Sequence, residues 1–503
     1  MNLQTLKRMA IAATCCVLSS QCWMAVVQAD ISMPKIFSDH MVLQRNSRVR
    51  IWGTSDDAGQ QLTVKFAGKE STVTTSDNGS WSVNINTPDA GGPYELEVIA
   101  AGGQPKVVFN DVLVGEVWLC VGQNNMQLEV SKTLNSENEI KLSKNFPRIR
   151  LFTVGDKASP QPLSDFHKVV PWRVCSPETV KDFSATAYFF GREISKKLKG
   201  KDLASVPIGL IDVSWDGTVC EAWTSRAALD KVEQLAPLLK HWDENPELLA
   251  SPNRPGNLFN GMIAPMLRFP IRGVIWYQGE ANHERGAQYS VLFPTLIKDW
   301  RKNFGLGEFP FYFVQLAPYR YVQKPAASLA EIRDAQLKTL HTVRGTRMVV
   351  TTDIGDLQDL NPKNKQEVGR RLALAALADV YADQLPADTQ KPFYSGPIYD
   401  TKSIDQDRIR ISFRHTHGGL AIRNDEPELT CFTICGEDGK FVPAEAKIEG
   451  DRLIVSSPDV KNPVEVRFAW NDSDQPNLVN AQGLPASPFR TDDFPLISEG
   501  RDF

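Results

Sequence analysis

Residues 117–127 read VWLCVGQNNMQ, an apolar run that ends in a glycine and a polar turn. A short apolar run bounded by turn residues is typical of a strand buried inside a parallel sheet. In open α/β sheets, the side chains that bind or react follow the carboxyl ends of such strands. We therefore predict a buried strand over Val112–Cys120 with a functional loop after it.

Strand and helix patterns alternate around this run, from about residue 109 to residue 394. Further apolar runs predict strands at Ile149–Thr153, Val206–Val213, Ile271–Tyr277, Phe311–Leu316 and Met348–Thr352. Amphipathic stretches between them predict helices at Phe183–Leu198, Gln288–Asn303, Leu329–Thr342 and Gln366–Tyr381. This alternation indicates a parallel sheet flanked by helices, which is an α/β fold.

Short strands and turns characterise the chain on both sides of the α/β region. Before it, strands are predicted at Val49–Trp52, Gln61–Phe66, Ser80–Val83 and Tyr94–Val98. After it, strands are predicted at Arg408–Phe413, Leu420–Ile422, Cys431–Cys435, Leu453–Val455 and Val464–Phe468. We expect β-sandwich-like domains at residues 30–108 and 395–503, flanking an α/β domain at 109–394.

The first 29 residues have the pattern of a signal peptide. Lys7 and Arg8 precede the apolar stretch Met9–Val27, and a small-x-small site predicts cleavage after Ala29. We therefore expect a secreted or periplasmic protein. No other apolar run is long enough to cross a bilayer, so we expect no membrane span.

Composition places the chain among ordinary soluble globular proteins. Its 503 residues are too many for one core and suggest about three domains. The formal net charge is -4 and no basic cluster stands out, which argues against nucleic acid as a partner. Five cysteines remain beyond the signal region, an odd number that leaves at least one free thiol: Cys120, Cys175, Cys220, Cys431 and Cys435.

Residues 122–126, GQNNM, resemble the first motif of the sialate O-acetylesterase family of SGNH hydrolases, whose usual form is GQSNM. Three more blocks resemble that family: IGLIDVSWDGT at 208–218, WYQGEAN at 276–282 and DIGDLQDLNPKNK at 353–365. The flanking regions match as well, through FSDHMVLQR at 37–45 and GLPASPFRT at 483–491. The resemblance covers essentially the whole mature chain.

This resemblance implies a flavodoxin-like, three-layer α/β domain between two β domains. It also implies a reaction, the removal of O-acetyl esters from sialic acid or another acetylated carbohydrate, with no cofactor and no metal. In the family a serine attacks the ester, a histidine deprotonates the serine, and an aspartate orients the histidine. Backbone and side-chain amides stabilise the oxyanion.

Both reacting positions of this chain carry asparagine. Asn124 occupies the nucleophile position and Asn361 the base position, while the orienting Asp359 is present. A carboxamide nitrogen is not a nucleophile for acyl transfer, and an amide does not titrate near neutral pH. Removing one triad member costs about 10⁴- to 10⁶-fold in rate. We therefore expect hydrolysis to be lost or very weak and carbohydrate binding to be retained.

The resemblance assigns oxyanion and substrate contacts to Gly217, Asn282 and Gln123, and a loop-supporting role to Glu280. Asp216 replaces a family glycine. It either repels the oxyanion or is a solvated loop residue. A second departure is Ala281, which replaces a serine.

Other residues could restore activity. His283 could act as a base, whereas Ser214 and Ser225 are hydroxyls near the second block. The spacing of His415 and His417 is a weak metal signal. Two alternatives stay open: an active esterase with a relocated nucleophile or a water activated by Glu280 or Asp359, and a structural or assembly role for the β domains.

Overall fold

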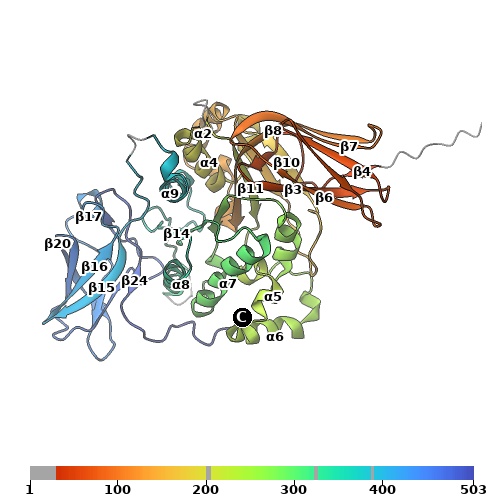
Figure 1. The fold of residues 1–503 in the computed structure, drawn as a ribbon. Helices are drawn as coiled ribbons and strands as arrows, with labels where there is room; N and C mark the ends of the chain where they lie inside the picture. The colour runs from red at the N-terminus through yellow and green to blue at the C-terminus, as the bar shows by residue number, and fades with distance from the viewer. Residues whose placement is uncertain (1–29, 200–204, 322–326, 387–389, 503) are drawn as a thin grey trace, which may run out of the picture.

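The computed structural model describes residues 30–199, 205–321, 327–386 and 390–502. The predicted signal peptide, residues 1–29, lies outside these ranges. Figure 1 shows two β units at opposite ends of the molecule, with the helices and the central sheet between them.

The central sheet has the strand order β10-β9-β11-β8-β12-β13-β14. Its members are β8 (Lys106–Gly122), β9 (Ile149–Val154), β10 (Val169–Val174), β11 (Ile208–Ser214), β12 (Gly273–Tyr277), β13 (Phe311–Val314) and β14 (Thr346–Val349). All six strands predicted for this region are confirmed, with ends that differ by a few residues. They run parallel to their neighbours within this sheet.

The expectation of a wholly parallel sheet is wrong at one edge. Strand β10, which the sequence did not reveal, runs antiparallel to β9 with an irregularity between Val170 and Arg173. Pro171 lies in that irregularity and has no N–H to donate, which suits an edge position. The structure is therefore a mixed α/β fold.

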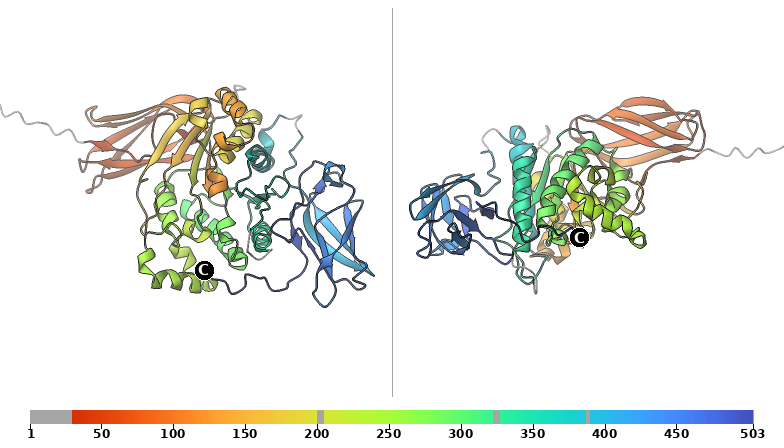
Figure 2. Two further views of the ribbon diagram at one scale, coloured as in Figure 1. Left: turned by 180° about the vertical axis from the view of Figure 1, so that it is seen from behind. Right: turned by 90° about the horizontal axis from the view of Figure 1, so that it is seen from below.

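Four long helices cover the two faces of this sheet: α4 (Ala185–Lys197), α7 (Gly286–Phe304), α8 (Ser328–Thr342) and α9 (Lys365–Asp379). Helix α4 packs against α9, and α7 packs against α8. Trp118 of β8 contacts Phe190 of α4, whereas Trp276 of β12 contacts Phe293 of α7. The register pairs Trp276 with Val121, so Trp118 and Trp276 point to opposite faces. The two helix pairs therefore form the outer layers of three. Figure 2 shows the same arrangement from two further directions.

Shorter helices lie in the connections. They are α1 (Asn124–Gln127), α2 (Ser136–Leu142), α3 (Pro177–Val180), α5 (Arg226–Leu229) and α6 (Ala236–Glu244). Helix α1 matters most for function because it begins directly after the carboxyl end of β8. Among the described residues, no helix is long and apolar enough to cross a membrane.

The N-terminal β unit shares strand β8 with the central sheet. One of its layers contains β2 (Val42–Gln44), β4 (Gln61–Phe66), β5 (Lys69–Thr74) and β7 (Gly91–Ala100), and the other contains β1 (Ile31–Ser32), β3 (Arg48–Ser55) and β6 (Ser80–Asn86). The first part of β8 pairs antiparallel with β7, and its later residues pair with β11 and β12. The same strand therefore runs without interruption through residues 108 and 109.

The C-terminal β unit contains two four-stranded sheets and one strand pair. Its strands are β15 (Ile398–Asp405), β16 (Arg408–Arg414), β17 (Leu420–Ile422), β18 (Phe432–Cys435), β19 (Val442–Pro443), β20 (Glu445–Glu449), β21 (Arg452–Ser456), β22 (Glu465–Phe468), β23 (Leu478–Asn480) and β24 (Phe489–Arg490). Phe489 joins the layers, because its ring stacks on Tyr399 at 4.9 Å and contacts Phe468 at 5.6 Å. After β24 the chain runs back to the helices of the α/β region, and Figure 1 shows the C-terminus beside α6.

The cysteines beyond residue 29 are all free thiols, and all but the partly exposed Cys431 are buried. Cys120 lies inside β8, where burial raises the pKa of its thiol well above the ordinary range. A thiol buried in this way stays protonated and is a poor nucleophile.

Candidate functional site

The candidate site forms where the carboxyl ends of β8, β11 and β12 meet the segment after β14. Gly122 ends β8, and a Cβ there would lie 2.0 Å from the carbonyl oxygen of Tyr277 in β12. Only glycine allows this close approach of two strands. The next residue, Gln123, donates its backbone N–H to the same carbonyl at 3.2 Å. The chain then turns into α1, and Asn124 is its first residue.

The side chain of Asn125 ties α1 to the loop that follows β14. Its Nδ2 donates to Glu280 Oε1 at 2.6 Å and to the carbonyl of Leu360 at 2.9 Å. Its Oδ1 accepts a hydrogen bond from Lys365 Nζ at 2.7 Å, and Lys365 also donates to the carbonyl of Pro362 at 2.6 Å. One buried amide therefore holds together three of the four sequence blocks.

These contacts bring the two asparagine positions to the same end of the sheet. Asn124 is the chain neighbour of Asn125, and Asn361 is the chain neighbour of Leu360. Asn124 is buried, with 9% of its surface exposed, and its Oδ1 accepts from Gln123 Nε2 at 2.8 Å. Its Nδ2 donates to no described residue.

At the base position, Asp359 bonds to the backbone of Asn361 and not to its side chain. Asp359 Oδ1 accepts the backbone N–H of Asn361 at 2.8 Å. The Oδ1 atom of Asn361 is shielded from solvent and accepts no hydrogen bond from the described residues. A buried acceptor without a partner costs about 1–3 kcal/mol. A ligand hydroxyl could donate to it only if the Asn361 side chain turned toward solvent.

The third block forms a closed amide network around Asn282. Gln278 Nε2 donates to Asn282 Oδ1 at 2.7 Å and to Gln123 Oε1 at 3.3 Å. Asn282 Nδ2 donates to Glu221 Oε2 at 2.9 Å, and Asn282 Oδ1 also accepts from the backbone of Cys220 at 2.9 Å. The oxygen and the nitrogen of the Asn282 amide therefore both form hydrogen bonds within the protein.

The second block places Gly217 in an exposed turn with φ +70° and open space around its Cα. Asp216 beside it is also exposed, and its backbone N–H donates to Gln127 Oε1 at 3.0 Å. This favours the expectation that Asp216 is a solvated loop residue.

Two ionisable groups of opposite sign are buried beneath the site. Burial raises the pKa of Glu280, although Asn125 and Lys365 oppose the shift, and its Oε2 atom has no hydrogen-bond partner among the described residues. Burial lowers the pKa of Lys365 to about 7, against the attraction of Glu280 and Asp359. Desolvation is the dominant cause in both groups.

Sequence reasoning missed Lys365, Gln278 and Glu221. All three are buried. Gln278 and Glu221 bond directly to the predicted Asn282, whereas Lys365 bonds to Asn125, which in turn bonds to Glu280. Lys365 and Gln278 lie inside the recognised blocks, so their positions were visible. Their partners were not, because those partners lie on other loops.

The residues considered for a relocated active centre have other partners. Ser214 Oγ donates to Asp212 at 2.7 Å, and Ser225 Oγ caps α5 and donates to Asp299 at 2.7 Å. The ring of His283 stacks on Tyr321 at 4.3 Å, and its Nδ1 lies 2.8 Å from the backbone oxygen of Glu280.

The remaining candidates, His415 and His417, lie after β16 with ring centroids 5.4 Å apart. Over the described ranges, no group of three or more histidine, cysteine or acidic side chains could hold a metal ion.

Comparison with known proteins places this arrangement in one family. Residues 114–378 match the family described as carbohydrate esterase, sialic acid-specific acetylesterase. The sialate O-acetylesterase of Homo sapiens is 30% identical over 493 residues, covering 90% of this chain and 91% of that protein. The enzyme of the same name from Mus musculus is 30% identical over 399 residues, covering 69% of this chain and 73% of that protein.

A solved structure agrees with these sequence matches. The crystal structure of a carbohydrate acetylesterase from Xanthomonas citri superposes with a TM-score of 0.82 and 33% sequence identity. The match covers 92% of this chain and all (100%) of that one. The similarity therefore includes both β units as well as the central layers.

Proposed function

Because the chain belongs to the sialate O-acetylesterase family of carbohydrate esterases, we propose that it binds an acetylated carbohydrate and hydrolyses it very weakly or not at all. The scaffold is that of an SGNH hydrolase. The ligand class is O-acetylated sialic acid or another acetylated sugar, held where the family's ester reacts.

The chemistry of the two asparagines supports loss of hydrolysis. Acyl transfer needs a group that can attack carbon and a group that can take and return a proton. Asn124 and Asn361 are carboxamides and do neither. Because residue 361 is asparagine, Asp359 has no imidazole to orient, and it accepts the backbone N–H of Asn361 instead.

The observation that carries retained binding is that Asn124 Nδ2 and Asn361 Oδ1 have no hydrogen-bond partner among the described residues. The first is a donor and the second an acceptor, on loops that Asn125 holds at the same end of the sheet. An acetyl carbonyl would accept from Asn124, and a sugar hydroxyl would donate to Asn361 once this half-buried side chain turns its Oδ1 toward the ligand. Both contacts are neutral hydrogen bonds, which suit an uncharged ester.

The test combines an esterase assay with calorimetry. The wild-type protein, the double variant Asn124→Ser/Asn361→His and the control Asn462→Ser are assayed on aryl acetates and O-acetylated sialic acid. Asn462 is exposed and distant in sequence from the site. We expect the wild type and the control to match the background, and the double variant to exceed them by about 100-fold or more. Wild-type turnover at ordinary enzyme rates would contradict the proposal.

One specific observation favours a second candidate, an esterase that uses activated water. Glu280 is buried with a raised pKa and an unbonded Oε2, which are properties of a general base. This candidate requires a measurable wild-type rate that Glu280→Gln or Asp359→Asn abolishes. A structural or assembly role would instead give no heat with acetylated or plain sugars.

Export is part of the proposal. The charged start and apolar stretch at residues 1–29 support a secreted or periplasmic location. Determining the N-terminal sequence of the natural protein tests it, with Asp30 expected as the first residue.

A further inference from the structure

A cavity of about 290 Å³ lies between the α/β region and the C-terminal β unit. It is lined by the end of α8, the start of β14, and residues before β15 and after β16. The candidate site lies at the carboxyl ends of the strands, whereas this cavity lies at the amino end of β14. The two are therefore separate.

Arginine dominates the charge of the cavity wall. Arg344, Arg347 and Arg414 line it, and no aspartate or glutamate does. Arg347 pairs with Asp379 at 2.7 Å and Arg414 with Asp400 at 3.3 Å. Arg344 is exposed and forms no ion pair with the described residues. The lining thus keeps an unbalanced positive charge.

A fourth arginine, Arg301, binds backbone carbonyls in the loop between α8 and β14 and before β13. Arg301 donates to the backbone oxygens of Arg344 at 2.8 Å, Gly345 at 3.1 Å and Phe309 at 2.8 Å. These carbonyls would otherwise repel an anion. No described carboxylate forms an ion pair with Arg301, although Glu308 lies near enough to attract it. Arg301 therefore adds a partly offset positive charge behind the cavity wall.

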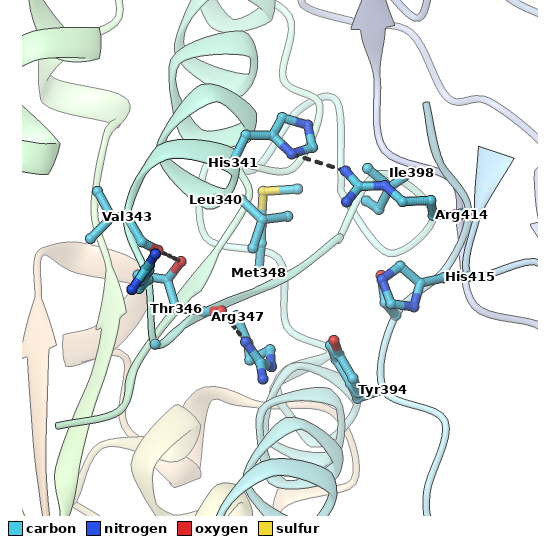
Figure 3. A pocket seen from close by; sticks show the side chains of 13 residues that line it. Leu340, His341, Val343, Thr346, Arg347, Met348, Tyr394, Ile398, Arg414 and His415 are labelled. Carbon is cyan, nitrogen blue, oxygen red and sulfur yellow. Dashed lines mark hydrogen bonds between the residues drawn. The ribbon is translucent and has the colours of Figure 1, made fainter. Parts of the chain in front are cut away.

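Two histidines line the cavity, His341 and His415, and His341 is oriented as a donor. Figure 3 shows His341 and Arg414 joined by a hydrogen bond, with an Nη2 to Nδ1 distance of 3.0 Å. An arginine can only donate, so Nδ1 of His341 is the acceptor and its proton lies on Nε2. The Nε2–H is therefore a further donor for a ligand.

The rest of the lining suits a sugar ring. Tyr394 lies beneath Arg347, with the guanidinium carbon 5.5 Å from the ring centroid. Leu340, Met348 and Ile398 add apolar surface beside the cationic groups. A volume of 290 Å³ is at the low end of ligand pockets, about 300–1,000 Å³, and fits a single sugar residue better than a long chain.

We propose that this cavity binds the anionic group of an acidic sugar, either a carboxylate or a sulfate ester. The guanidinium groups would bind the anion, for which their planar forks are suited. The apolar side chains and Tyr394 would contact the ring. The sugar part rests on the proposed carbohydrate function, whereas the anionic part rests on the arginines alone. A glycan with acetyl and acidic groups would thereby have two contacts on the protein.

The experiment is calorimetric titration of the full chain at fixed ionic strength. The probes are glucuronate and N-acetylneuraminate (carboxylates), galactose 6-sulfate (a sulfate ester), neutral galactose and inorganic sulfate. The variant is Arg344→Gln/Arg414→Gln, at two exposed positions of the cavity wall. The control Arg48→Gln/Arg452→Gln removes the same charge from exposed positions elsewhere.

We expect at least one acidic sugar to bind, and galactose to bind at least tenfold more weakly. The Arg344/Arg414 variant should bind the acidic sugar with at least tenfold lower affinity than the wild type. The control should bind as the wild type does. Protection of Arg344 and Arg414 from phenylglyoxal by the bound sugar provides a second readout that needs no variant. Equal binding of galactose, binding of inorganic sulfate alone, or an unchanged arginine variant would each overturn the proposal.

The variant Asn124→Ala separates this proposal from the proposed function. Acidic-sugar binding that survives Asn124→Ala and fails in the arginine variant supports the second site, whatever happens at the first. Binding that is lost only in Asn124→Ala contradicts the second site and leaves the first intact.

Discussion

The carboxyl group of Asp212 is buried in β11, between β9 and β8, and has one hydroxyl partner. Ser214 Oγ donates to it at 2.7 Å. Burial raises the pKa of Asp212 from 3.8 to about 7, and nearby Asp156 adds to the effect. Between these two pH values the folded protein keeps a proton that the unfolded chain has lost. Stability therefore falls as pH rises from about 4 to about 7, and it stays low above that.

Replacing this carboxyl with an amide removes the free-energy cost of ionising a buried group. Going from pH 4 to pH 8, Asp212→Asn should gain about 2–4 kcal/mol in free energy of unfolding relative to the wild type. Urea unfolding at pH 4, 6 and 8 measures this. Asp459→Asn, at an exposed position, is the control and should gain nothing. A difference that is the same at all three pH values would show that Asp212 ionises normally.

At the level of single residues, the sequence predicted which loops would meet, while the roles of their side chains stay predictions. Asn124, Asp359 and Asn361 were assigned from the recognised blocks, and the hydrogen bonds of Asn125 place their loops together. The hydrogen bonds of Asn282 inside its own network could not be predicted. They depend on Glu221, which comes from a different loop and has no periodic pattern to mark it.

Helix packing depends on one glycine where α4 meets α9. A Cβ on Gly369 would lie 2.5 Å from the Cβ of Phe189 and 2.6 Å from the backbone nitrogen of Phe190. Alanine is the better helix former, yet here its methyl group would force the helices apart. We expect Gly369→Ala to destabilise the protein by about 1–3 kcal/mol.

Thermal and urea unfolding test this packing. Arg370→Ala, on the exposed side of the same helix, is the control and should change stability by less than about 1 kcal/mol. If Gly369→Ala were as stable as the wild type or more so, helix propensity would outweigh packing at this contact.

Elements with a strong apolar or amphipathic pattern were predicted well, and edge elements were not. The six central strands and four long helices are found within a few residues of the expected ends. Strand β10 was missed because Pro171 and Arg173 interrupt its apolar pattern. The early part of β8 was missed because residues 106–111 are mostly half-exposed and do not read as a buried run.

On the scale of the whole molecule, the C-terminal segment links the β unit to the central helices. The backbone N–H groups of Ile497 and Ser498 donate to the buried carboxylate of Glu331 in α8 at 2.6 Å and 3.2 Å. Ser498 Oγ accepts the backbone N–H of Ala287 in α7 at 2.9 Å. Ala287 lies five residues after Asn282.

Deleting residues 496–503 should therefore loosen the part of the site that carries Asn282. Glu331 would lose two donors while remaining largely enclosed, at a cost of about 1–3 kcal/mol. Hydrogen exchange of peptides spanning residues 280–290 should become faster. Arg501→Ala is the control, because it removes only an ion pair of 3.9 Å. Unchanged exchange in the deletion variant would mean that this segment only covers the surface.

The continuity of β8 has a consequence for how this protein could engage a glycan layer. A sugar-binding module that is joined by a flexible linker reorients freely. The sugar that it binds therefore has no fixed position relative to the neighbouring domain. Here the single strand β8 joins the N-terminal β unit to the loop that carries Asn124. A saccharide bound by the N-terminal β unit would have a fixed orientation and distance relative to that loop. Removing or replacing this unit would also disrupt β8, which positions the loop.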